Sequence, residues 1–300
     1  MMSTNPRDSD APPPWFQRAL DHRPSELAVE VEGARIHSRT WGEPGQPLLM
    51  LVHGGGAHSG WWDHIAPFFA ATHHVVAPDL SGHGDSETRP SYGLGSWSRE
   101  VLAVAAAANP SARPVIVGHS MGGWVTGTAA IREGDKIDGI VVLDSPLRDR
   151  APEAGHLRQV GQHEGHLTRE AIMSRFRPVP GQDVILPYVA EHIARESVRR
   201  KGLRWRWKFD PAIFQGRWVS EGPGEADTME HIFAQMPCRI AYLRCEYGSI
   251  DIDMAERIRE MLQLRGPFIH LPEAGHHPML DQPLALVAAL RTLVEMWSIT

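Results

Sequence analysis

Residues 118–122 read Gly-His-Ser-Met-Gly and join two segments of different character. The β-branched run Val115–Val117 comes directly before them, and the helical spacing of Met121–Arg132 begins within them. In a strand, tight turn and helix of this kind, the backbone of the central serine is strained. Bulky side chains two positions before or after that serine would clash. Glycine at positions 118 and 122 removes those side chains. The pattern predicts that the Oγ of Ser120 is presented above the edge of a sheet.

Short apolar runs alternate with segments of helical spacing, which indicates an α/β fold with a doubly wound, mostly parallel sheet. The alternation stops after about residue 146, and we interpret residues 147–234 as an inserted helical cap without strands. The core is then 27–146 and 235–300, and the Pro-rich residues 1–26 form a flexible arm. The expected strands are Pro47–His53, His74–Leu80, Pro114–Gly118, Gly139–Asp144, Cys238–Cys245 and Pro267–Leu271, and the expected helices are Ser98–Ala108, Met121–Arg132, Ile185–Val198, Asp253–Leu264 and Pro283–Trp297.

Charge and composition exclude several classes of function. The formal net charge of -6 offers no basic surface for nucleic-acid phosphates. The chain has no apolar run long enough to span a membrane and its start lacks the apolar run of a signal peptide, so we expect a cytoplasmic protein. The 17 histidines show no zinc-ligand spacing, and the odd spacing of Cys238 and Cys245 points them to opposite faces of a strand. We expect scattered surface histidines, no disulfide, no metal and no cofactor.

Two further motifs precede the serine turn. His53-Gly54-Gly55-Gly56 follows the first strong apolar run, and the loop Asp79–Ser86 follows the next. Together with the serine turn, these motifs make residues 27–297 resemble the α/β-hydrolase superfamily, in the branch that carries a helical cap. The resemblance implies that the backbone N–H groups of Gly55 and Met121 form an oxyanion hole. It also implies that His53 shapes its turn and that the Asp79 loop is braced by its own hydrogen bonds.

The segment after the last expected strand holds the histidine that the resemblance requires. His276 directly follows Gly275 and is expected to be the general base, because an imidazole with a near-neutral pKa can take the serine proton and return it to the leaving group. His277 is the alternative base and otherwise lines the pocket. Asp281 is expected to cap the N-terminus of the final helix.

The acid that orients this histidine has two candidate positions. The superfamily usually carries it after the strand Cys238–Cys245, but this chain has Gly248 at that place and only Asp251 nearby. In a subset of capped relatives, among them haloalkane dehalogenases, the acid ends the strand after the nucleophile helix, where this chain has Asp144. A carboxylate at either place would accept the second imidazole N–H and stabilise the imidazolium. We favour Asp144 and keep Asp251 as the alternative.

A serine at position 120 indicates acyl transfer, whereas the dehalogenases and epoxide hydrolases of this superfamily use aspartate. We therefore predict hydrolysis of a carboxylic ester through an acyl-enzyme on Ser120. The alternatives are a C–C bond hydrolase or lactonase on the same triad, an acyltransferase or perhydrolase, and a ligand receptor of the same fold. The expected partner is a small apolar or aromatic ester, and the oligomeric state is left open. The tryptophans expected near the pocket are Trp61, Trp62, Trp124, Trp205 and Trp207.

Overall fold

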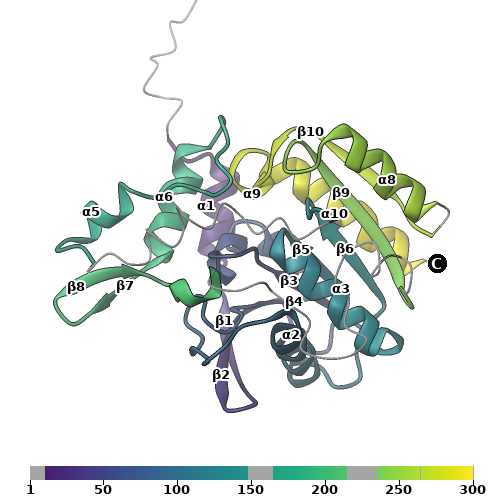
Figure 1. Ribbon diagram of the computed structural model, residues 1–300, viewed down its shortest axis with the longest axis horizontal. Coiled ribbons are helices and arrows are strands. Elements are labelled where there is room, and N and C mark those ends of the chain that lie inside the picture. Colours follow the sequence, from purple (N-terminus) through teal and green to yellow (C-terminus); the bar gives the residue numbers. More distant parts are fainter. Residues whose placement is uncertain (1–10, 148–164, 215–232, 234–235, 264, 300) are drawn as a thin grey trace, which may run out of the picture.

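A computed structural model describes residues 11–147, 165–214, 233, 236–263 and 265–299. Within them, eight strands form one sheet in the order β1-β2-β4-β3-β5-β6-β9-β10 (Figure 1). Six neighbouring strands of this order, β4, β3, β5, β6, β9 and β10, run parallel to one another. Strand β2 pairs antiparallel with β4, and β1 pairs antiparallel with β2. The predicted mostly parallel sheet is confirmed. Its strands are β1 (Ser25–Val31), β2 (Ala34–Trp41), β3 (Leu48–Val52), β4 (His74–Pro78), β5 (Val115–His119), β6 (Gly139–Leu143), β9 (Arg239–Tyr247) and β10 (Phe268–Gly275).

Helices cover both faces of the sheet, as Figure 1 shows, so the central strands are apolar throughout. In β3, Met50 and Val52 belong to a core cluster shared with α2 (Leu94–Ala108), α3 (Met121–Glu133) and α8 (Ile252–Leu262). Leu49 and Leu51 belong to a second core cluster, which is shared with α1 (Pro14–Asp21), α6 (Pro187–Glu196) and α10 (Pro283–Ser298). This division follows from the alternation of side chains along a strand. The helices of the core are α2 (Leu94–Ala108), α3 (Met121–Glu133), α8 (Ile252–Leu262), α9 (Pro278–Asp281) and α10 (Pro283–Ser298), with 3-10 turns η2 (Ser59–Trp62), η3 (Ala66–Phe68) and η4 (Gly134–Lys136).

The expectation of a flexible arm over residues 1–26 is wrong for its described part. Helix α1 (Pro14–Asp21) packs against the core, and Phe16 in it is only 2% exposed. The ring of Phe16 lies 4.8 Å from the ring of Tyr188, centroid to centroid. The prolines do not prevent this helix, because proline is well suited to a helix's first turn. The remaining residues of the predicted arm, 1–10, lie outside the described part.

The predicted cap is described from residue 165 to residue 214, and we call these residues the cap segment. It contains α5 (Arg169–Met173), α6 (Pro187–Glu196) and η5 (Pro211–Phe214). It also contains an antiparallel hairpin of β7 (Val198–Lys201) and β8 (Arg204–Trp207), so the prediction of an insertion without strands is wrong. The hairpin turns at Gly202, whose φ of +63° favours glycine. The rest of 147–234 falls mostly outside the described residues.

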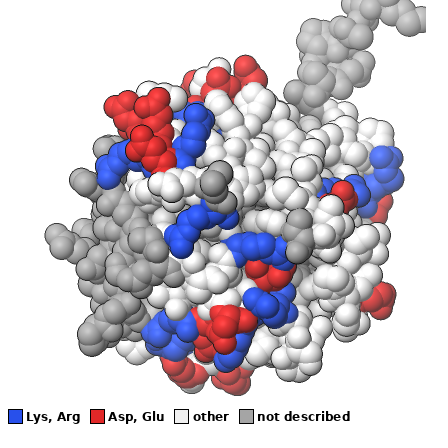
Figure 2. All heavy atoms as spheres, turned by 90° about the vertical axis from the view of Figure 1, so that its right-hand side faces the viewer, with Lys and Arg blue, Asp and Glu red and all other residues white. Residues whose placement is uncertain are grey.

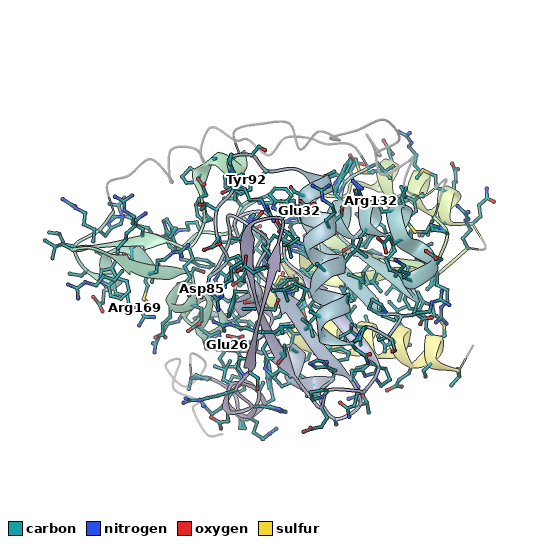
Figure 3. All side chains as sticks on the ribbon, turned by 90° about the horizontal axis from the view of Figure 1, so that it is seen from below. Glu26, Glu32, Asp85, Tyr92, Arg132 and Arg169 are labelled. Carbon is teal, nitrogen blue, oxygen red and sulfur yellow. The ribbon has the colours of Figure 1, made fainter. Side chains whose placement is uncertain are left out.

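Buried and half-buried polar contacts fasten the cap segment to the core. Arg39 of β2 donates to Asp63 at 2.5 Å and to Glu196 at the end of α6 at 2.6 Å. The Nε2 of His192 lies 2.9 Å from the same Asp63 carboxylate. Figure 3 shows Asp85 near the junction of the two parts, while Arg169 lies farther out.

Three further observations concern membrane-spanning helices, surface charge and the two cysteines. None of the helices in the described ranges is long and apolar enough to cross a membrane. On the face seen in Figure 2, Lys and Arg side chains lie beside Asp and Glu side chains and form no continuous basic surface. Cys238 and Cys245 are both free, as their spacing predicted.

Candidate active site

Ser120 occupies the turn between β5 and α3 with φ 53° and ψ -120°, a strained conformation for a residue with a side chain. A Cβ added to Gly118 would lie 2.2 Å from the carbonyl oxygen of Gly122. A Cβ added to Gly122 would lie 2.6 Å from the carbonyl oxygens of both Val52 and His53. The backbone therefore requires glycine at both positions, and the predicted turn is confirmed.

Ser120, His276 and Asp144 form a hydrogen-bonded chain. The Nε2 of His276 lies 3.0 Å from Ser120 Oγ, and its Nδ1 lies 2.7 Å from Asp144 Oδ2. The backbone N–H groups of Cys245 and Ser249 donate to the two oxygens of Asp144 at 3.0 and 2.8 Å. Because a carboxylate only accepts, the proton of His276 sits on Nδ1 and its Nε2 faces the serine hydroxyl with a lone pair. This is the arrangement that a serine nucleophile requires.

Gly248 explains why the carboxylate comes from position 144. A Cβ on Gly248 would lie 2.2 Å from Oδ2 of Asp144, so the two possible acid positions compete for one space. Asp144 has φ 45°, a conformation that aspartate adopts more readily than most residues. Asp251, the other candidate, is exposed and caps α8 by accepting the N–H of Met254 at 2.8 Å. The structure brings Asp144, and not Asp251, to His276.

Gly55 and Met121, the two predicted oxyanion donors, follow the ends of two neighbouring parallel strands, β3 and β5. Met121 is the first residue of α3, so its N–H has no acceptor within the helix. Gly55 lies in the turn after β3, where a Cβ on the adjacent Gly54 would lie 3.2 Å from the Cβ of Ser120. Strand order reverses between β3 and β5, and doubly wound sheets bind ligands at the carboxyl ends of strands at such a reversal.

The motif residues expected to be structural make structural contacts. The Nε2 of His53 accepts the N–H of Leu80 at 3.0 Å, which ties the two turns together. Asp79 accepts the N–H of Ser59 at 2.6 Å and a hydrogen bond from His37 at 2.8 Å. Burial acts to raise the pKa of Asp79, but its hydrogen bond with His37 and nearby histidines hold that pKa well below its usual range. Within the loop, the N–H of Asp85 donates to the Asp79 carboxylate at 2.9 Å and the hydroxyl of Ser86 donates to the Asp79 carbonyl at 2.6 Å, so the predicted bracing is confirmed.

Asp281 does not cap the final helix. Gln282 occupies the N-cap position of α10, and the carboxylate of Asp281 accepts the N–H of Gly275 at 2.6 Å. Asp281 therefore holds the start of the loop that carries His276. The cap assignment failed because Asp281 ends the short helix α9, from which its carboxylate reaches a backbone donor outside α10.

A cavity of about 110 Å³ opens beside Ser120, between the core and the cap segment. Trp61 and Trp207 line it, as expected, but Trp62 and Trp124 are buried in the cores. Trp205 points to Arg169, whose guanidinium lies 5.4 Å from the indole ring. Sequence reasoning missed most of the cap wall, since no motif marks it. The other cap residues of the lining are Arg175, Phe176, Arg177, Pro178, Val179, Ser197, Lys208 and Phe209.

The expectation of scattered surface histidines is wrong, because nine of the 17 are buried within the described ranges. His119, the last residue of β5 before Ser120, donates from Nε2 to the carbonyl oxygen of His276 at 2.7 Å. Burial lowers the pKa of His119 to about 3 and that of His277 well below its usual value. Sequence gave no sign of this contact, which joins residues 157 positions apart. The buried histidines are His37, His53, His58, His64, His74, His83, His119, His276 and His277.

The model of the alpha/beta hydrolase family matches residues 49–290, which include every residue of this site. The chain belongs to the alpha/beta hydrolase family. An esterase of Mycobacterium tuberculosis is 26% identical over 278 residues, 88% of each protein. Epoxide hydrolase A of the same organism is 31% identical over 132 residues, 43% of this chain and 41% of that enzyme. A human serine hydrolase-like protein is 32% identical over 126 residues, 62% of its own length.

The fold of this alpha/beta hydrolase is also that of solved structures. The crystal structure of E-2-(acetamidomethylene)succinate hydrolase aligns with a TM-score of 0.76 over 91% of this chain and 99% of that one, at 16% identity. At this identity the likeness concerns the fold. The two curated relatives with the higher identities are matched over only part of their lengths.

Proposed function

We propose that this alpha/beta hydrolase cleaves carboxylic esters through an acyl-enzyme on Ser120. The observation that carries the proposal is the hydrogen-bonded chain from Ser120 Oγ through His276 to Asp144. Ser120 attacks the ester carbonyl as His276 takes its proton, and the tetrahedral oxyanion accepts hydrogen bonds from the N–H groups of Gly55 and Met121. His276 returns the proton to the departing alkoxide.

Water then completes the reaction by the same steps in reverse roles. His276 takes a proton from water, the resulting hydroxide attacks the acyl group, and Ser120 leaves with that proton. The free carboxylic acid is released. Asp144 keeps the Nδ1–H tautomer of His276 and stabilises the imidazolium in both halves of the reaction.

The nucleophile favours ester cleavage over epoxide opening, although epoxide hydrolase A is among the relatives. Epoxide opening leaves an alkyl ester that water resolves only when the nucleophile is a carboxylate. Position 120 carries a serine, whose oxygen would form a stable ether in that reaction. Acyl transfer leaves an ester on Ser120 that water can cleave.

The lining of the cavity supports an apolar or aromatic ester as the substrate. Four aromatic side chains face it, Trp61 from the core and three from the cap segment. Indole and phenyl walls bury an apolar acyl or alcohol group and fix it by shape. The three from the cap segment are Phe176, Trp207 and Phe209.

Labelling with a fluorophosphonate probe tests the activated serine without a choice of substrate. Intact mass should show one adduct on the wild type and none on Ser120→Ala. A series of nitrophenyl esters from acetyl to lauroyl, followed by lactones, then measures acyl preference. A wild type that takes no label and turns over no ester contradicts the proposal and favours a receptor of the same fold.

A further inference from the structure

Three buried histidines converge beside Ser120, and hydrolysis needs only one of them. One ring nitrogen of each of His119, His276 and His277 lies within 4.8 Å of those of the other two. The ring centroids are 4.7 to 5.3 Å apart. Both His119 and His277 line the cavity, so a small solute that enters it meets the cluster.

Each neutral ring of this cluster has one nitrogen with a lone pair, and hydrogen bonds identify that nitrogen in two of the three rings. His119 donates from Nε2 to a carbonyl oxygen, which leaves its Nδ1 unprotonated. His276 donates from Nδ1 to Asp144, which leaves its Nε2 unprotonated. Neither ring nitrogen of His277 makes a hydrogen bond of good geometry among the described residues, although the residue is only 6% exposed and the backbone of Val179 and Pro180 lies close to the ring. A buried polar ring without a well-formed hydrogen bond is a candidate for binding a ligand.

The groups behind two of the rings resemble those that proteins place behind zinc ligands. A metal-binding histidine donates its second N–H to a carboxylate or a backbone carbonyl, which fixes its tautomer and orientation. Here the carboxylate of Asp144 holds His276, and the backbone carbonyl of His276 holds His119. Tetrahedral zinc, with Zn–N distances of about 2.0 to 2.1 Å, needs its nitrogens about 3.4 Å apart. The three nitrogens lie within 4.8 Å of one another, so metal binding requires them to approach by up to about 1.4 Å, with movement of more than one ring.

We propose that His119, His276 and His277 form an inhibitory site for a divalent transition metal that favours imidazole, such as Zn²⁺ or Co²⁺. Capture of Nε2 of His276 removes the base from Ser120, which lies 3.0 Å away. The fourth position of a tetrahedral ion is then open to water or to Ser120 Oγ. Metal binding rests on the histidine geometry alone, and its inhibitory effect rests on the proposed hydrolase function.

The test measures binding in a protein that cannot turn over substrate. Untagged Ser120→Ala protein is titrated with Co²⁺, followed by visible absorption, and with Zn²⁺, followed by calorimetry. We expect one site per chain with the absorption of a tetrahedral Co²⁺ ion. Adding His277→Phe keeps a ring of similar size but removes both ring nitrogens, and with them the lone pair that could bind a metal. It should weaken binding at least about tenfold, since even changes in the groups behind zinc ligands cost that much.

Matched variants separate loss of a ligand from loss of folding. His64→Phe removes another buried histidine with an unpartnered ring nitrogen and should leave metal affinity unchanged. His119→Gln retains an N–H donor for the His276 carbonyl and should weaken binding as His277→Phe does. Thermal unfolding shows that each variant is folded before it is titrated.

Inhibition by Zn²⁺ and the metal affinity of the variants together decide the proposal. Zn²⁺ should inhibit ester hydrolysis by the wild type, EDTA should reverse it, and His277→Phe should raise the inhibitory Zn²⁺ concentration about tenfold. Equal affinity in folded His277→Phe and its parent, or no stoichiometric binding up to millimolar metal, overturns the site. If the wild type hydrolyses no ester, the function proposal fails, whereas the Co²⁺ titration still decides the metal site.

Discussion

The two walls of the cavity are built in different ways. On the core wall, backbone contacts fix the reacting groups, and a Cβ on Gly118, Gly122 or Gly248 would lie 2.2 to 2.6 Å from its nearest atom. In the cap segment, a Cβ on Gly181, which lies outside the cavity lining, would meet nothing within 4 Å. Arg175 on the cap wall is exposed, in contrast to the buried Asp144. The three core glycines therefore tolerate almost no change, whereas Gly181 has room for a side chain and Arg175 is free to vary in size and charge.

This difference indicates a division of labour between the two walls. Groups that must hold a proton or an oxyanion to within a fraction of an ångström come from the core, where the sheet sets their positions. Under the proposed function, we expect the groups that select a substrate to come mainly from side chains of the cap segment, which an insertion can change without moving Ser120, His276 or Asp144. The following substitutions should affect rate on the core wall and selectivity on the cap wall.

Loss of the nucleophile or of the acid should have the largest effect. Ser120→Ala should lower kcat by about 10⁶-fold and Asp144→Asn by about 10⁴-fold, since the latter favours the wrong tautomer of His276. Asp251→Asn is the control, because asparagine caps a helix as well as aspartate does. Steady-state kinetics with a nitrophenyl ester measures all three. A larger loss in Asp251→Asn than in Asp144→Asn would contradict the assignment of the acid.

Gly122, beside Ser120, and Gly181, in the cap segment, should differ in the substitutions that they tolerate. Gly122→Ala brings a Cβ within 2.6 Å of two carbonyl oxygens, and we expect it to destabilise the fold by about 1 to 3 kcal/mol and to abolish labelling of Ser120. Gly181→Ala on the cap segment should change the free energy of unfolding by less than about 0.5 kcal/mol. Urea denaturation compares the two variants. An equal loss of unfolding free energy in Gly122→Ala and Gly181→Ala would contradict the stricter steric limits that we infer for the core.

Acid should weaken the fold through the core histidines. Burial lowers the pKa of His58 and of His64 to about 4, so between about pH 6.5 and pH 4 the unfolded chain binds protons that the folded chain does not. Stability is fully present above that range and falls within it by about 1.4 kcal/mol per pH unit for each histidine. His64→Gln keeps a donor for the carbonyl of Met279 and should reduce this slope by one proton.

Urea denaturation at a series of pH values measures that slope. The exposed His22→Gln is the control for loss of one histidine. A slope that is the same in wild type and in His64→Gln would mean that His64 takes up its proton without unfolding, and would contradict its buried, uncharged state.

The carboxylate that contacts His276 should also function from position 248, because a side chain there would occupy the space that the Asp144 carboxylate fills. Asp144→Gly alone loses activity, and adding Gly248→Asp should restore it at least about tenfold, because the new carboxylate enters the vacated volume. Glycine also accepts the φ of 45° at position 144. Gly248→Asp in the wild type is the comparison and should be destabilised by two carboxylates in contact. A folded double variant without recovery would show that the acid requires the position-144 backbone.

The cap wall should control selectivity by a smaller amount. Trp207→Ala should lower the preference for a benzoyl ester over an acetyl ester about fivefold in kcat/KM, through loss of a ring contact. Trp205→Ala, in the same strand but outside the cavity lining, should leave the ratio unchanged. Competition between the two esters measures the ratio. The same loss from both variants would assign the effect to the hairpin rather than to the pocket.

The sequence predicted most of the fold and part of the site. Its six parallel strands, the serine turn and the loop of His276 follow from contiguous residues, because strand alternation and glycine sterics act over a few positions. The β7–β8 hairpin was missed, because Arg-rich strands exposed to solvent lack the apolar alternation of core strands. Helix α1 was missed, since only a docked Phe16 distinguishes it from a Pro-rich arm.

By itself, the sequence determined that Ser120 sits in a strained turn and that His276 follows the last strand. It narrowed the acid to two residues, and only the tertiary structure brought Asp144 to His276, because Gly248 leaves room for a side chain from another strand. The cluster of His119 with His276 and His277 was also decided by the tertiary structure. Local sterics are encoded in neighbouring residues, whereas contacts across more than 100 positions depend on how the whole sheet packs.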